Sequence, residues 1–186
     1  MASVRVVAAE SSDVPTLFDL INLAYQVETG DSGVAFKKTD RLLDTSELAP
    51  HVAAGRTLKA LGADGAIAGC ICFEEVVHGA GAGAGAEERH MHFGPFAVAV
   101  SAQGRGVGRA LLEALYAHAR ARGIRYVDIE VVNHRTDILP LYAKMGYVPF
   151  GEGDFPAPER LSRPSSFVMM RLDLEKRPGT TEAGGD

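Results

Sequence analysis

The segment of this chain best suited to bind an anion is QGRGVGR at 103–109. It follows a strand-like stretch, PFAVAV, and precedes a helical pattern. Glycine lets the backbone approach a ligand closely, and the first N–H groups of a helix have no partner within the helix. The helix dipole adds partial positive charge at the same end. The segment therefore predicts a phosphate or pyrophosphate site at the start of a helix.

Other interpretations of this glycine turn stay open. A nucleoside triphosphatase loop needs Gly-Lys-Ser/Thr, whereas this turn ends in Gly108, Arg109 and Ala110. The dinucleotide pattern GxGxxG is not met either. The alternatives are a tight connection that only needs flexible residues and a nucleotide-binding protein of another class.

Strand and helix patterns alternate around this turn. Seven segments have strand-like patterns: 4–9, 57–61, 66–77, 90–100, 124–132, 147–151 and 165–174. Helical patterns occur near 14–24, at 106–122 and at 138–145, with weaker short helices at 41–48 and 50–54. Gly123 ends the long helix, and Asp137 is the expected N-cap of the helix at 138–145.

The whole pattern predicts one domain over residues 1–174, because a chain of 186 residues suits a single core. The stretch HGAGAGAGAEE, within 78–89, has almost no side-chain surface to bury, so we expect a flexible loop there. Residues 175–186 are polar and predict a disordered tail. Cys70 and Cys72 share one strand face, which disfavours a disulfide and predicts buried reduced thiols.

Composition and charge disfavour several classes of protein. The formal net charge of -5 gives no positive field for a nucleic acid. No apolar run reaches about 18 residues and the start lacks a secretory pattern, so we expect a cytoplasmic protein, in the cytosol or nucleus, with no membrane partner. His90 and His92 lack the further ligands that a zinc site needs, so we expect no metal.

The glycine turn resembles the signature of the GCN5-related N-acetyltransferase (GNAT) family, Gln/Arg-x-x-Gly-x-Gly/Ala, at Gln103, Gly106 and Gly108. The resemblance extends to the preceding PFAVAV strand, to Asn133 after the next strand and to Tyr142 in LYAKMGY. Two motifs in the right order are more specific than either one alone, and the matching elements cover nearly the whole chain.

The sequence departs from the pattern of the GNAT family at two places. Val100 and Ser101 stand where many relatives have His-Pro-Asp-type residues. The spacing from Asn133 to Tyr142 is slightly longer than is common, which puts the placement of Tyr142 in question.

The resemblance implies a fold and a cosubstrate. The fold is a single α/β (α+β) domain with a mixed, mostly antiparallel sheet of about seven strands flanked by helices. The cosubstrate is acetyl-CoA, whose pantetheine arm pairs with β-strand backbone and whose pyrophosphate lies on the amides of the glycine turn. The residues expected to bind it are Phe96, Val98, Gln103, Gly104, Arg105, Gly106, Val107, Gly108, Arg109, Asn133 and Tyr142.

The implied reaction is direct transfer of the acetyl group to an amine in a ternary complex. It requires a neutral amine, a stabilised oxyanion and a proton for the departing thiolate. By resemblance, Tyr142 donates that proton and the Val98 N–H stabilises the oxyanion. Glu130 is the expected base, with His90, His92 or a water relay as alternatives.

The acceptor amine is less well defined than the cosubstrate. A small molecule, a protein N-terminus and a lysine all fit, because residues 25–55 and 78–90 contain no specificity motif. Their acidic residues favour a cation: Asp31, Asp40, Asp44 and Glu47. A monomer and a homodimer are both compatible with the sequence. The main alternative is an inactive module that binds the coenzyme without turnover.

Overall fold

The computed structural model describes residues 4–26, 41–78, 88–160 and 163–176. Its centre is a seven-stranded sheet in the order β1-β2-β3-β4-β5-β7-β6, in which only β4 and β5 run parallel. The strands are β1 (Arg5–Ala8), β2 (Thr57–Leu61), β3 (Ile67–His78), β4 (Glu88–Val98), β5 (Tyr126–Val132), β6 (Val148–Asp154) and β7 (Ser166–Asp173). The predicted α/β class with a mixed, mostly antiparallel sheet is confirmed.

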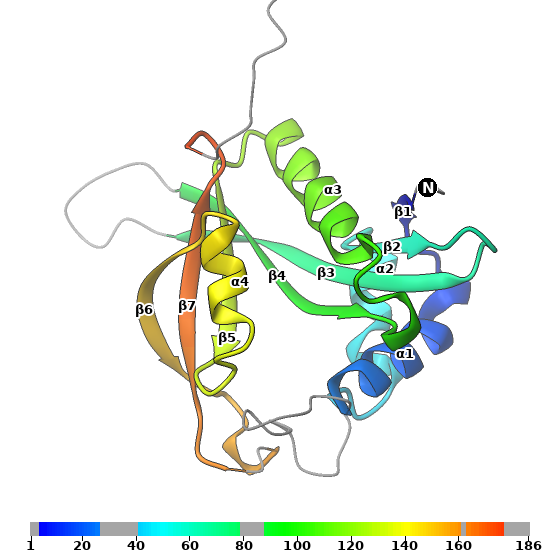
Figure 1. The fold of residues 1–186 in the computed structure, drawn as a ribbon, viewed down its shortest axis with the longest axis horizontal. Coiled ribbons are helices and arrows are strands. Elements are labelled where there is room, and N and C mark those ends of the chain that lie inside the picture. The colour runs from blue at the N-terminus through cyan, green and yellow to red at the C-terminus, as the bar shows by residue number, and fades with distance from the viewer. Residues whose placement is uncertain (1–3, 27–40, 79–87, 161–162, 177–186) are drawn as a thin grey trace, which may run out of the picture.

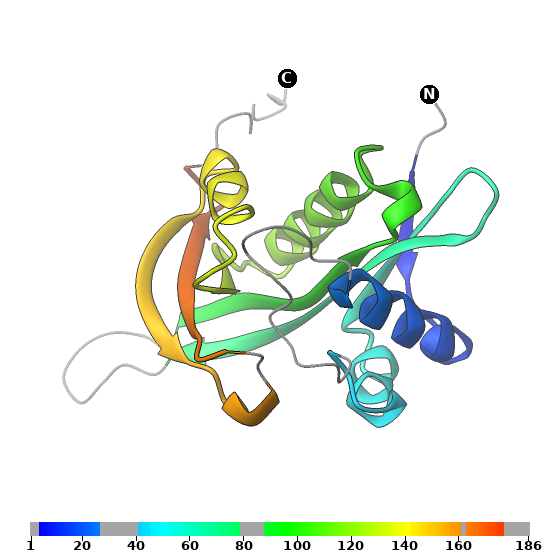
Figure 2. The ribbon, with the colours of Figure 1, turned by 60° about the horizontal axis from the view of Figure 1, so that its bottom comes forward.

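Helices cover both faces of the sheet (Figures 1 and 2). The α-helices are α1 (Val14–Gln26), α2 (Ala49–Ala53), α3 (Val107–Ala121) and α4 (Leu139–Lys144). Short 3-10 helices are η1 (Ser11–Asp13), η2 (Thr45–Glu47), η3 (Val100–Ala102) and η4 (Pro158–Arg160). None of the helices in the described ranges is long and apolar enough to cross a membrane.

The alternation of β3 side chains separates two cores. Ile71 and Phe73 point toward the larger core, which the apolar face of α3 and Tyr142 of α4 complete. Cys70 and Cys72 point to the opposite face, where α1 packs. Both cysteines are free and buried, and burial raises the pKa of each thiol. The expectation of buried reduced thiols is confirmed, and neither sulfur is an activated nucleophile.

Helix α3 lies close to the sheet because Gly69 of β3 has no side chain. A Cβ on Gly69 would stand 2.9 Å from the Ala97 carbonyl oxygen and 3.0 Å from Cγ1 of Val107. Those distances are below normal contact, so any larger residue would push α3 outward. Because the glycine turn precedes α3 directly, this close approach also sets the distance between the turn and β4.

A bulge in β4 opens the sheet. Phe73 pairs with Phe93 but Ile71 pairs with Phe96, so β4 carries one extra residue between these pairs. Gly94 accommodates the bend with a φ of 152°. Beyond it, β4 leaves β5, because the two strands pair only from His90 to His92. Figure 1 shows the two strands diverging below this point.

Several element boundaries differ from the expectations. The strand expected at 90–100 is Glu88–Val98, and Val100 lies in η3. Of the short helix expected at 41–48, only Thr45–Glu47 is helical. The expected flexible loop and tail fall mostly at 79–87 and 177–186, outside the described residues.

The expected N-cap at Asp137 is wrong, because Ile138 occupies the N-cap position of α4. The Asp137 carboxylate instead accepts two hydrogen bonds of 2.9 Å from the guanidinium of Arg135. A paired guanidinium offers a charged donor, which is stronger than a backbone N–H.

Candidate active site

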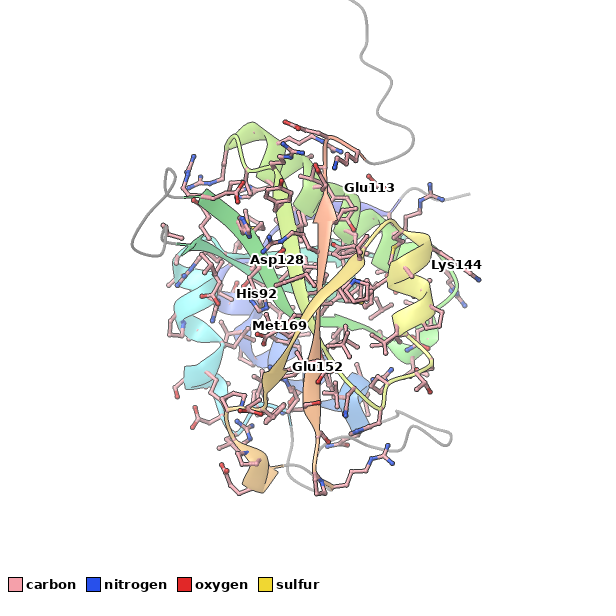
Figure 3. The ribbon with its side chains drawn as sticks, turned by 90° about the vertical axis from the view of Figure 1, so that its left-hand side faces the viewer. His92, Glu113, Asp128, Lys144, Glu152 and Met169 are labelled. Carbon is pink, nitrogen blue, oxygen red and sulfur yellow. The ribbon has the colours of Figure 1, made fainter. Side chains whose placement is uncertain are left out.

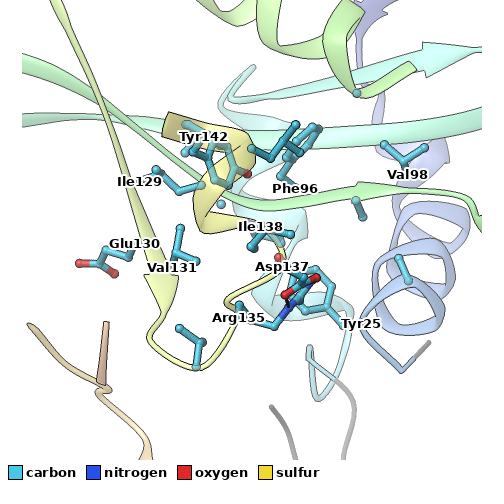
Figure 4. A pocket seen from close by; sticks show the side chains of 18 of the residues that line it. Tyr25, Phe96, Val98, Ile129, Glu130, Val131, Arg135, Asp137, Ile138 and Tyr142 are labelled. Carbon is cyan, nitrogen blue, oxygen red and sulfur yellow. Dashed lines mark hydrogen bonds and ion pairs between the residues drawn. The ribbon is translucent and has the colours of Figure 1, made fainter. Parts of the chain in front are cut away.

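The diverging strands leave a slot of about 710 Å³ between β4 and β5. Residues 93–98 of β4 form one wall and residues 129–132 of β5 form the other. The glycine turn and α4 close the slot on the α3 side of the sheet (Figure 4). The slot therefore connects the two faces of the sheet.

The glycine turn forms the rim of this slot. Gly106 is the N-cap residue of α3, with a φ of 83° and no side-chain cap. The first N–H groups of α3 are thus left for a ligand or solvent. At Gly108, a Cβ would stand 3.3 Å from Cζ of Phe96 and 3.5 Å from Cγ2 of Val98, so glycine keeps this approach open.

Most of the expected coenzyme-binding residues line the slot, and one from the turn does not. Those that do are Phe96, Val98, Gln103, Gly104, Gly106, Val107, Gly108, Arg109 and Tyr142. Arg105 is exposed and is not among the residues that line the slot. Its positive charge lies beside the start of α3, where it favours an anion without touching the slot walls.

The backbone of β4 turns its free edge toward the slot. The Ala99 N–H donates to the Ala68 carbonyl on the β3 side, at 2.9 Å. Successive N–H groups of a strand alternate in direction, so the backbone groups of Phe96 and Val98 face the opposite edge. Since β5 has left β4 by this point, these groups face the slot instead of a strand.

Tyr142 occupies the α4 end of the slot and is 6% exposed. Its ring packs against Tyr147 and Phe93, with centroids 5.4 and 6.3 Å away. Burial, with the nearby phenols of Tyr25 and Tyr116, raises the pKa of Tyr142 well above its usual value. The phenol is therefore protonated at neutral pH, as a proton donor requires. Figure 4 shows its hydroxyl directed toward Phe96.

Glu130 and His92 reach the slot from the α1 side of the sheet. Glu130 alternates with Ile129 and Val131, which face the core below α4, and its exposed carboxylate points away from Tyr142 (Figure 4). Nδ1 of His92 lies 3.8 Å from Oε1 of Glu74. Figure 3 shows His92 on the same side of β7 as α2, with α4 on the other side.

His90 shares a strand face with His92, as expected, but it lies outside the slot lining. Its side chain is 2% exposed, and Nδ1 lies 2.9 Å from Oδ2 of Asp128. Asp128 also accepts two hydrogen bonds of 2.8 Å from Arg171. Burial alone would raise the pKa of Asp128, but the bonds from Arg171 and His90 outweigh it and lower the pKa. His90 therefore belongs to a structural polar network.

Asn133 is exposed and lies at the end of β5, outside the slot lining. Its backbone N–H donates to the Ser166 carbonyl at 2.9 Å, and its side-chain oxygen accepts from the Ser166 N–H at 3.4 Å. These bonds tie the end of β5 to the start of β7. Its place favours a role in positioning β5.

Sequence reasoning missed several residues that line the slot. Tyr25 comes from the end of α1, Phe155 follows β6, and Phe167 lies in β7. The Arg135–Asp137 ion pair lines the slot between β5 and α4. No local motif connects these residues.

The acidic residues expected to favour a cationic acceptor have structural partners where they are described. The Asp44 carboxylate accepts from the Ser46 N–H at 2.6 Å and caps η2. Glu47 accepts from the Leu43 N–H and pairs with Arg160. Asp31 and Asp40 lie outside the described residues. The described acids therefore give no support to a cationic acceptor.

Solved structures share this architecture. The yncA protein of Salmonella typhimurium, solved with acetyl-CoA as its cofactor, is 18% identical, with a TM-score of 0.66 over 100% of this chain and 99% of that one. A GCN5-related N-acetyltransferase from Kribbella flavida is 22% identical, with a TM-score of 0.67 over 91% and 97% of the two chains. The ribosomal-protein-S18-alanine N-acetyltransferase of Escherichia coli is 16% identical, with a TM-score of 0.65 over 96% and 99%.

The fold of this chain is thus similar to that of solved N-acetyltransferases. The family profile described as the acetyltransferase (GNAT) family matches residues 16–147, and this chain belongs to that family. No curated protein sequence matches it significantly. The family assignment confirms the resemblance seen in the glycine turn and in the Tyr142 motif.

Proposed function

We propose that this protein transfers an acetyl group from acetyl-CoA to an amine, directly and within a ternary complex. The observation that carries the proposal is the slot, which opens on both faces of the sheet. The glycine turn and Tyr142 lie on one side, and Glu130 lies on the other. A donor and an acceptor can thus meet without a covalent acetyl-enzyme, and neither Cys70 nor Cys72 is among the described lining residues.

The donor side fits a pantetheine arm and a pyrophosphate. The backbone edge at Phe96 and Val98 offers hydrogen bonds to the amides of the arm, as a neighbouring strand would. The N–H groups at the start of α3 hold the pyrophosphate, and Arg109 adds a positive charge. The acetyl-CoA in the yncA protein of similar fold supports this choice of cosubstrate.

Three groups of this chain carry the chemistry. Glu130 takes a proton from the acceptor ammonium, through water, so that the neutral amine attacks the thioester carbonyl. The Val98 N–H stabilises the oxyanion of the tetrahedral intermediate. Attack leaves the amine nitrogen with an extra proton, which it releases to water. As the C–S bond breaks, the Tyr142 phenol gives its proton to the thiolate, and water carries the proton released by the nitrogen back to the phenolate.

The experiment that tests this function is a screen of amines for thiol release from acetyl-CoA, with wild type and Tyr142→Phe. Calorimetric titration with acetyl-CoA runs in parallel. Amine-dependent thiol release supports the enzyme. Tight coenzyme binding without release for any amine would instead indicate a coenzyme-binding module. Equal competition by ATP would favour a nucleotide-binding protein.

A further inference from the structure

Three aromatic side chains form a wall on the acceptor side of the slot: Tyr25, Phe155 and Phe167, hereafter the aromatic wall. The rings of Phe155 and Phe167 are 5.0 Å apart, and Tyr25 packs with Phe155 and Val132 in a small apolar cluster. Phe167 pairs with Val132 across β5 and β7, so it shares the sheet face of Glu130. The wall is therefore on the side that the amine must use.

The aromatic wall is held in place by polar contacts outside the slot. The Asn22 carboxamide of α1 binds both backbone groups of Leu42, at 2.8 and 3.1 Å. Arg160, which follows Phe155 in the chain, donates to the Arg41 carbonyl at 2.7 Å and pairs with Glu47 at 3.5 Å. These bonds tie α1, the segment 41–47 and the β6–β7 loop together, so little ordering remains when a ligand binds.

Positive charge on this side of the slot disfavours acceptors that carry a second ammonium group. The Arg41 guanidinium lines the slot and lies 5.9 Å from the centre of the Tyr25 ring. The described lining holds two carboxylates: Asp137 pairs with Arg135, and the proposed function assigns Glu130 to the amine. Among the described lining residues, a second ammonium on the acceptor would meet the positive charge of Arg41, which is unfavourable in a partly desolvated site.

We propose that the acceptor is a primary amine whose carbon skeleton bears an aromatic or large apolar group, without a second positive charge. The amine points to Glu130, and the apolar group packs on the aromatic wall. The inference rests on the proposed function. Free amines, amino acids and peptide N-termini can all present this chemistry.

The test compares matched amines that differ in one aromatic ring. The pairs are phenethylamine against ethylamine, phenylalanine against alanine, and two peptide amides that begin with these residues, with spermidine as the polycationic class. We expect kcat/KM about 10- to 100-fold higher for the aromatic member of the preferred pair, as burial of a ring predicts. The aromatic amine with the highest kcat/KM shows whether the acceptor is a free amine, an amino acid or a peptide N-terminus.

Variants connect the preference to the aromatic wall. Phe155→Ala should lower kcat/KM for the aromatic member of the preferred pair far more than for its aliphatic partner, and Phe155→Leu should restore part of the preference. The matched control is Phe150→Ala, because Phe150 is 45% exposed and stacks on Arg171 outside the slot. Equal rates within every pair, a preference for spermidine, or equal losses in Phe155→Ala and Phe150→Ala would overturn the inference.

A failure of the proposed function is distinguishable from a failure of this inference. If no amine accepts an acetyl group, the enzyme proposal fails. Calorimetry of phenethylamine and ethylamine with the coenzyme A-loaded protein then still tests the wall. Tighter binding of phenethylamine that Phe155→Ala removes supports the wall, and equal binding contradicts it.

Discussion

Tyr142 and Glu130 lie on opposite faces of the sheet, and one slot reaches both of them. Tyr142 belongs to the core under α3 and α4, where burial keeps its phenol protonated. Glu130 is exposed on the α1 side. The proposed proton donor and the proposed base are thereby held on separate sides of the slot.

The first prediction concerns the proton donor. Tyr142→Phe should lower kcat about 10²- to 10³-fold with little change in the KM for acetyl-CoA. The variant lacks the acid that protonates the departing thiolate, whereas the contacts that bind the coenzyme remain. Steady-state thiol release measures it. Tyr147→Phe is the control, since its hydroxyl lies 3.1 Å from that of Tyr116 and outside the slot lining. Equal losses in both variants would refute a chemical role for Tyr142.

The second prediction concerns the glycine turn. Gly106→Ala and Gly123→Ala both place a side chain at positive φ, 83° and 69°, with no heavy atom within 4 Å of the new Cβ. Each should cost about 1–2 kcal/mol of unfolding free energy from backbone strain. Only Gly106→Ala should weaken acetyl-CoA binding, by about 10-fold or more, because its Cβ meets the pyrophosphate. Calorimetric titration of each variant with acetyl-CoA measures the affinities, and equal affinities would contradict binding of the pyrophosphate at the glycine turn.

The third prediction concerns the base. Glu130→Gln should lower kcat/KM about 10²-fold at neutral pH, because the amine then loses its proton to bulk water only. Glu152→Gln, at an exposed glutamate of β6, should leave kcat/KM unchanged. His92→Gln in the same series separates the two candidate bases. A loss in His92→Gln alone would move the role from Glu130 to His92.

The parts of the site that consecutive residues build were predictable from the sequence. The glycine turn is one of them, because its glycines and the helix start are adjacent in the chain and their chemistry is local. Gly106 and Gly123 both adopt the positive φ that the turn and the helix end require. Tyr142 was found through the family motif, and the slightly longer spacing from Asn133 does not displace it from the slot.

The parts that depend on which strands are neighbours were not predictable from the sequence. Alternation put His90 and His92 on one face, but only the β4–β5 pairing shows that Asp128 holds His90 in a buried network. The slot itself follows from the bulge near Gly94, which no periodicity indicates. The aromatic wall joins α1 to β7 and to the loop after β6, both of which lie far from α1 in the sequence.

The last prediction concerns the Asp128 network and pH. The pKa of Asp128 is lowered in the folded protein, so its pairing stabilises the fold above the unfolded value near 3.9 and loses this effect as pH falls through the lower folded pKa. Asp128→Asn should cost about 2–4 kcal/mol at pH 7, because the largely buried His90 and Arg171 lose their anion.

Urea unfolding of wild type and Asp128→Asn at pH 7, 5 and 3 measures this difference. It should be smaller at pH 3 than at pH 7, because Asp128 of the unfolded wild type binds a proton near its ordinary pKa, before the folded carboxylate does. Asp173→Asn is the matched control, because Asp173 pairs with Arg125 in a more exposed setting and should cost less than about 1 kcal/mol. A difference that stays constant down to pH 3 would show that the network acts through packing, without its charge.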